Sequence, residues 1–146
     1  MTPQEEKELL LRVVLRIAQT QLEKGGFIPF GATLGPGREA QLLMPTSAKR
    51  EITIDKVVAY WKVQMSKAIE TSKITTLCTV TDVRISDNDG KLIPGVFIHV
   101  EHWAGDAEDI LFPYTKDENA KVTLQEPAKE ATNLQFFVTS DDSSRH

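Results

Sequence analysis

Residues 74–103 read ITTLCTVTDVRISDNDGKLIPGVFIHVEHW. Apolar and polar side chains alternate on both sides of Asp89-Gly90, a dipeptide that favours a type I′ hairpin turn. We therefore expect one strand that runs to Ile85 and a returning strand over Ile93–Trp103. Successive side chains of a strand point to opposite faces of a sheet. One face of the first strand then holds Leu77, Thr79, Thr81, Val83 and Ile85, and the other holds Cys78, Val80, Asp82 and Arg84.

The chain after this hairpin predicts one more long strand. A second tight turn at residues 104–106 leads into an alternating segment over residues 107–114. Residues 116–130 are polar, with at most a short edge strand around residues 122–124. Residues 134–138 are apolar enough to dock on the sheet, and residues 140–146 are expected to form a flexible C-terminal tail.

The N-terminal segment predicts an amphipathic helix. Thr2 and Glu5 match the capping-box pattern, and Pro3 occupies the first helical position, where its fixed φ suits a helix. Apolar residues from Leu9 to Leu22 recur at helical spacing. Gly25-Gly26 then ends the helix, because glycine adopts the left-handed conformation without a steric clash.

Two further elements are expected between this helix and residue 74. Phe30–Leu34 and Ala40–Met44 are short apolar runs around the turn cluster Gly35–Arg38, which predicts a hairpin. Gly31 lies inside the first of these strands, where a missing side chain lets another backbone or a helix approach closely. After a polar connector, a second amphipathic helix is expected from about Asp55 to Ser72.

Together these elements predict a single α+β domain over residues 1–139 with the order α-β-β-α-β-β-β. We expect a twisted antiparallel sheet with the two amphipathic helices packed on one face. The strand patterns leave both faces mixed in character, so a second copy or the C-terminal segment could cover part of the other face. This order is similar to that of roadblock and longin-type domains, which dimerise and scaffold larger assemblies.

Composition narrows the classes of partner. The chain has 146 residues, 40% of them hydrophobic, and a net charge of -4 with basic residues scattered among acids. Such a surface lacks the basic face that neutralises phosphates, so we expect no nucleic-acid partner. No signal peptide or membrane-spanning run is evident, and the single Cys78 is expected to be a buried thiol in a reducing compartment. We therefore expect a soluble, cytoplasmic protein.

Four sequence blocks carry a second resemblance. They are Gly26–Leu34 (GFIPFGATL), Thr81–Ile85 (TDVRI), His99–His102 (HVEH) and Phe112–Tyr114 (FPY). Together they resemble a family of small, uncharacterised bacterial proteins. The resemblance implies a bacterial, cytoplasmic origin, and it brings no established activity and no catalytic residues.

Five polar residues on the predicted strands are candidates for chemistry: Asp82, Arg84, His99, Glu101 and Tyr114. Asp82 and Arg84 share a strand face, and so do His99 and Glu101. If the register brings the two faces together, these side chains form one polar patch in which a histidine beside a carboxylate serves as a base. The alternative is cross-strand ion pairing on a solvated face, worth ~0.2–1 kcal/mol for each pair.

Neither a metal nor a cofactor is expected. His99 and His102 are an odd number of residues apart on one strand, so they point to opposite faces and cannot hold one ion together. No phosphate-binding loop or nucleophile-elbow motif occurs in the chain. The favoured hypothesis is therefore a non-enzymatic interaction or scaffold module that binds another protein or itself. The alternative is a small-molecule-binding protein or enzyme with a polar site on the sheet face.

Overall fold

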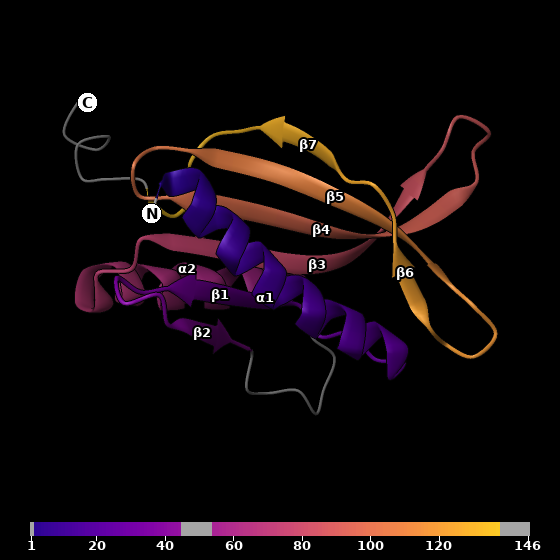
Figure 1. Cartoon of the computed structure of the whole chain (residues 1–146), viewed down its shortest axis with the longest axis horizontal. Coiled ribbons are helices and arrows are strands. Elements are labelled where there is room, and N and C mark those ends of the chain that lie inside the picture. The colour runs from indigo at the N-terminus through magenta and orange to yellow at the C-terminus, as the bar shows by residue number, and fades with distance from the viewer. Residues whose placement is uncertain (1, 45–53, 138–146) are drawn as a thin grey trace.

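The computed structural model of the chain describes residues 2–44 and 54–137. Within these ranges it contains two helices and seven strands (Figure 1). The elements are α1 (Pro3–Glu23), β1 (Phe30–Leu34), β2 (Ala40–Leu43), α2 (Ile54–Ser72), β3 (Thr76–Ser86), β4 (Leu92–His102), β5 (Ala107–Lys116), β6 (Val122–Leu124) and β7 (Ala128–Ala131). The α+β class and the predicted element order are confirmed, as is the short strand β6. Strand β7 lies in a segment that we had expected to contain no further strand.

The strands form one antiparallel sheet in the order β2-β1-β3-β4-β5-β6, which does not close into a barrel. Its centre is the pairing of β3 with β4, in which eleven residue pairs run from Thr76↔His102 to Ser86↔Leu92. Strand β5 has two partners on its outer side. Its first half pairs with β7 and its last three residues pair with β6.

The turn between β3 and β4 differs from the predicted type. Gly90 donates its backbone N–H to the Asp87 carbonyl at 3.0 Å, and Asp87 donates to the Lys91 carbonyl at 2.8 Å. A type I′ turn requires a positive φ at both central residues. Gly90 has a φ of 80°, but the φ of Asp89 is not positive. The prediction of a type I′ turn is therefore wrong. The loop has the geometry of a longer hairpin connection with a left-handed glycine, and the Asp87 side chain supports it by accepting from the N–H groups of Asp89 and Lys91.

The start of α1 has the predicted capping box. The Glu5 backbone N–H donates to Thr2 Oγ1 at 3.1 Å, and the Thr2 N–H donates to Glu5 Oε1 at 2.9 Å. Two of the unpaired N–H groups at the helix end are thereby satisfied. At the other end Gly25, with a φ of 88°, turns the chain toward β1.

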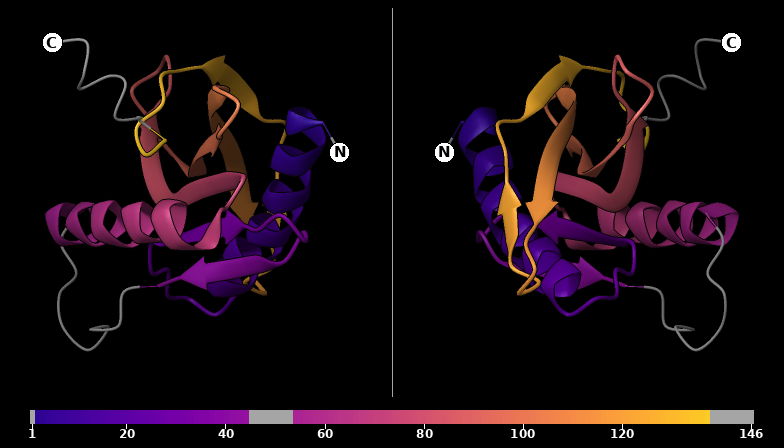
Figure 2. Two further views of the ribbon diagram at one scale, coloured as in Figure 1. Left: turned by 90° about the vertical axis from the view of Figure 1, so that its left-hand side faces the viewer. Right: turned by 90° about the vertical axis from the view of Figure 1, so that its right-hand side faces the viewer.

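The two helices cover opposite faces of the sheet (Figure 2). Phe30, Ala32 and Leu34 of β1 belong to the hydrophobic core beneath α1. Gly31 faces the other way, since a Cβ on it would lie 2.8 Å from Met65 Cε of α2. The prediction that both helices pack on one face is wrong, because the inner strands carry apolar residues on both faces. The close approach of a helix at Gly31 is confirmed.

Two segments share the α2 side of the sheet. Helix α2 packs Val57, Trp61 and Met65 against Leu77 of β3. The segment after β7 then adds Leu134, Phe136 and Phe137 to the same cluster, as the predicted docking of residues 134–138 requires. Val138 lies outside the described residues, as do the polar connector after β2 and the predicted C-terminal tail.

Substitution of Gly31 by alanine tests the opposite-face arrangement. The new Cβ would lie 2.8 Å from Met65 Cε and 3.2 Å from the Cys78 carbonyl, which is backbone. We expect the free energy of unfolding to fall by about 1–3 kcal/mol in urea denaturation. The control is Gly26→Ala, whose Cβ meets nothing within 4 Å. Equal stability of the two variants would contradict the packing of α2 on this face.

Candidate functional site

The five candidate residues lie on two different faces of the sheet. In the β3–β4 register Asp82 pairs with Val96, and Arg84 pairs with Pro94. His99 pairs with Thr79, and Glu101 pairs with Leu77. Paired residues of an antiparallel sheet share a face, so Asp82 and Arg84 lie on the α1 side whereas His99 and Glu101 lie on the α2 side. The prediction of one polar patch is wrong, because even-numbered residues of both strands share a face in this register.

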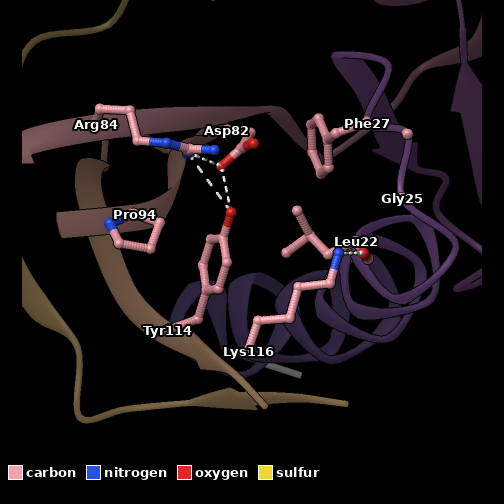
Figure 3. A pocket seen from close by; sticks show the side chains of 9 residues that line it. Leu22, Gly25, Phe27, Asp82, Arg84, Pro94, Tyr114 and Lys116 are labelled. Atoms are coloured by element: carbon pink, nitrogen blue, oxygen red, sulfur yellow. Dashed lines mark hydrogen bonds and ion pairs between the residues drawn. The ribbon is translucent and has the colours of Figure 1, made fainter. Parts of the chain in front are cut away.

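Three of the candidates line a cavity on the α1 side, which we call the Asp82 cavity (Figure 3). It lies where α1 ends against β3, β4 and β5, and its volume is about 280 Å³. Its lining residues are Leu22, Gly25, Gly26, Phe27, Asp82, Arg84, Pro94, Tyr114 and Lys116. Polar side chains from two strands therefore meet apolar residues from the end of the helix.

Asp82 is the centre of the hydrogen bonds in this cavity. Its Oδ1 accepts from the Tyr114 hydroxyl at 2.9 Å and from Arg84 Nη1 at 2.8 Å. Burial, and then the hydrogen bond to Asp82, raise the pKa of Tyr114. The hydrogen bond to Asp82 likewise raises the pKa of Arg84. The phenol and the guanidinium thus stay protonated and hold the carboxylate in one position.

Lys116 is a cavity residue that the sequence reasoning missed. Its Nζ donates to the Leu22 carbonyl at 2.9 Å, at the C-terminal end of α1. A cation is favourable there because the last carbonyls of a helix carry partial negative charge. The available signal was its spacing from Tyr114, since two residues apart on β5 means the same face.

His99 and Glu101 belong to a second cluster on the α2 side. His99 Nδ1 lies 2.7 Å from Asp109 Oδ1, and His99 Nε2 lies 2.5 Å from Glu101 Oε2. Burial opposes protonation of His99, but the hydrogen bonds to Glu101 and Asp109 outweigh it and raise the pKa of the imidazole. Both ring nitrogens are therefore occupied by carboxylates, so His99 offers no free nitrogen to a substrate. Asp109 was not among the sequence candidates, although it pairs directly with His99 across β4 and β5.

Glu101 holds the C-terminal segment on the sheet. Its carboxylate accepts from the backbone N–H groups of Gln135, Phe136 and Phe137, and its side chain has no exposed surface. Burial raises the pKa of Glu101, but the hydrogen bonds from His99 and from these three N–H groups outweigh it and lower the pKa. The cluster therefore acts as a structural clamp between β4 and the segment that follows β7.

His102 lies on the α1 side, as the odd spacing from His99 predicted. Its Nδ1 accepts from the Ala104 N–H at 3.0 Å, so the ring carries its proton on Nε2 and donates to Glu6 Oε1 at 2.7 Å. Glu6 also accepts from the Thr75 hydroxyl at 2.9 Å. This contact joins α1 to the sheet and leaves His102 outside the Asp82 cavity.

Comparison of the chain with protein-family models, with curated proteins and with solved structures found no significant match. The resemblances stated above, to a bacterial family and to roadblock and longin-type domains, therefore stay predictions. Among residues 2–44 and 54–137, no group of three or more His, Cys, Asp or Glu side chains is arranged to hold a metal ion. In the same part of the chain, no helix combines the length and the apolar character that crossing a membrane requires.

Titration of His99 tests the clamp. We expect its midpoint, followed by NMR of the ring protons, to lie above the ordinary value of about 6.5. A pKa raised by folding stabilises the folded state below about pH 6.5, and that contribution is lost as the pH rises through the folded-state pKa. Glu101→Gln should lower the midpoint, because it removes the charge next to Nε2. A wild-type midpoint at or below 6.5 would contradict the arrangement.

Proposed function

We propose that this chain is a small-molecule-binding protein and that the Asp82 cavity is its binding site. The observation that supports this proposal is the convergence of Asp82, Arg84 and Tyr114, three of the five sequence candidates, on one cavity. Their hydrogen bonds fix the positions of the charged groups before any ligand arrives. Binding then costs little ordering of side chains, which favours affinity.

The size and lining of the cavity suit a small metabolite. Its volume of about 280 Å³ lies just below the range for drug-sized ligands. Phe27, Leu22 and Pro94 supply apolar contact, and Asp82 and Lys116 supply opposite charges. This mixture of apolar walls and a few fixed polar groups is typical of ligand sites.

Binding fits the chemistry of these groups better than catalysis. The Tyr114 hydroxyl donates to Asp82, and its raised pKa keeps it protonated at neutral pH, so no phenolate is available to act as a base. Arg84 stays protonated for the same reason. The groups act as fixed donors and acceptors that orient a ligand.

A variant that fills the cavity tests this proposal. Gly26 lines the cavity, and a Cβ on it would meet nothing within 4 Å, so Gly26→Leu adds bulk without a clash at the backbone. We expect a library of small polar fragments, screened by ¹H–¹⁵N NMR, to yield binders that shift the signals of Phe27 and Tyr114. Gly26→Leu should abolish these shifts, and Gly26→Ala should keep them. Binders that shift only other surfaces, or none at all, would overturn the proposal.

The interaction-module hypothesis has support from a separate surface. Beyond the area covered by α2, the α2 side of the sheet has a groove of about 470 Å³, which we call the α2-side groove. Its lining residues are Val83, Ile85, Phe97, Asp109, Leu111, Ala128, Lys129 and Glu130. Apolar surface on the central strands of a sheet is normally covered by a second layer.

We propose a second copy of this chain as the occupant of the α2-side groove. Sheets pack face to face through apolar side chains, and Phe97 and Leu111 lie on neighbouring strands of this groove. Glu130 pairs with Asp109 and lies on this face of the sheet, whereas Lys129 pairs with Ile110 and lies on the α1 side, so the occupant is inferred from the apolar side chains of the groove.

The oligomeric state tests this second proposal. We expect analytical ultracentrifugation to show a concentration-dependent dimer for the wild-type protein and a monomer for Phe97→Asp, because a buried unpaired carboxylate is costly. The control is Val63→Asp, at a residue of α2 that is 58% exposed and outside the groove. A wild-type protein that stays monomeric at ~100 μM, well above a micromolar dissociation constant, would overturn the proposal.

A further inference from the structure

We infer that the ligand of the Asp82 cavity is a short zwitterion, with an ammonium group that binds Asp82 and a carboxylate that binds Lys116. This inference rests on the proposed function and adds the chemical class of the ligand. It follows from two observations. Asp82 has an acceptor and Lys116 has donors that form no hydrogen bond within the described residues, and the charged side chains of the lining add up to a net positive charge.

The Asp82 end offers an acceptor. Both described hydrogen bonds to this carboxylate, from Tyr114 and Arg84, reach Oδ1. Among the described residues nothing donates to Oδ2, and 19% of the side chain is exposed. Figure 3 shows the carboxylate between Arg84 and Phe27. An ammonium group at this position would meet the negative oxygen, and Phe27, whose ring can also attract a cation, lines the same cavity.

The Lys116 end offers donors. An ammonium group has three N–H donors, and only the bond from Nζ to the Leu22 carbonyl is formed among the described residues. The bond to the helix end holds Nζ beside the cavity, as Figure 3 shows. The remaining donors suit a carboxylate, with which they form charge-assisted hydrogen bonds.

The balance of charge favours a ligand that carries both groups over a ligand that carries only one. Asp82 and Arg84 form an ion pair at 2.8 Å and largely offset each other, so Lys116 leaves the lining with a surplus of positive charge. A simple cation would be repelled by that surplus. A simple anion would cover Asp82 Oδ2 without giving it a donor, and an unpaired buried acceptor is costly. A zwitterion satisfies both ends.

The space between the two ends sets the size of the ligand. Leu22, Pro94 and the Tyr114 ring supply apolar surface there, and the whole cavity measures about 280 Å³. This volume accommodates a carbon chain of a few atoms with a charged group at each end.

The test uses four compounds of equal chain length. 4-Aminobutyrate and 2-aminobutyrate carry both groups at two spacings, whereas butyrate lacks the ammonium group and butylamine lacks the carboxylate. We expect one of the two amino acids to bind the wild-type protein at least about tenfold more tightly than either single-ended compound, in ¹H–¹⁵N NMR titrations that follow Phe27 and Tyr114.

Two variants assign the ends. Lys116→Met should remove the preference for the amino acid over butylamine, and Asp82→Asn should remove the preference over butyrate. The control is Lys121→Met, an exposed residue outside the cavity lining, which should change neither. If Asp82→Asn fails to fold, the Lys116 variant and the comparison among compounds still decide the result.

The outcomes separate the ligand class from the function. Butyrate or butylamine that binds in the cavity as tightly as both amino acids would overturn the zwitterion and leave the binding function intact. Fragments that bind in the cavity while neither amino acid does would have the same meaning. A cavity whose signals respond to none of the four compounds and to no fragment would overturn both.

Discussion

The pairing of β3 with β4 is the constraint on which the rest of the structure depends. Eleven residue pairs in one register determine the face of every side chain on the two central strands. With that register Asp82 lies under the end of α1, and Glu101 lies under the C-terminal segment. A shift by one residue would exchange the two faces of one strand, which would place Asp82 and Arg84 on the α2 side of the sheet and turn Leu77 toward the α1 side. Both clusters of charged residues therefore follow from the same backbone hydrogen bonds.

The two faces of the sheet are covered in different ways, and each way leaves a different kind of surface. The long helix α1 packs across several strands (Figure 1), and the Asp82 cavity lies where this helix ends, beside Gly25. On the other face α2 and the C-terminal segment cover the region around Leu77 and Glu101, so the far end of the central strands keeps apolar side chains in a groove. The cavity is small and charged, and the groove is wide and apolar. A small ligand and a second copy of the chain are accordingly the occupants that we propose for them.

Much of the fold could be predicted from the sequence, and the limits have physical causes. The capping box, the two long strands and the alternation along β3 depend on neighbours in the chain, so local patterns were sufficient. The predicted placement of α2 was wrong because all five residues of β1 are buried, and a strand that is buried on both faces does not indicate which helix covers which face. Strand β7, with the sequence AKEA, lacks β-branched residues, and its extended form comes from pairing with β5. The sequence did not reveal that the candidate residues belong to two sites. Their grouping depends on the register between β3 and β4, and side-chain alternation along each strand does not determine that register.

The clamp at Glu101 has a consequence for the order in which the protein folds during synthesis. Glu101 precedes Gln135, one of its amide donors, by 34 residues. While the ribosome adds that part of the chain, strand β4 can pair with β3, but its carboxylate has none of the three amide partners that it has in the folded protein. Burial of the carboxylate at that time would be costly, so this region must stay hydrated until the donors emerge. Nascent chains that stop before residue 135 therefore leave the part of this face beside Glu101 uncovered and are natural targets for chaperones and proteases.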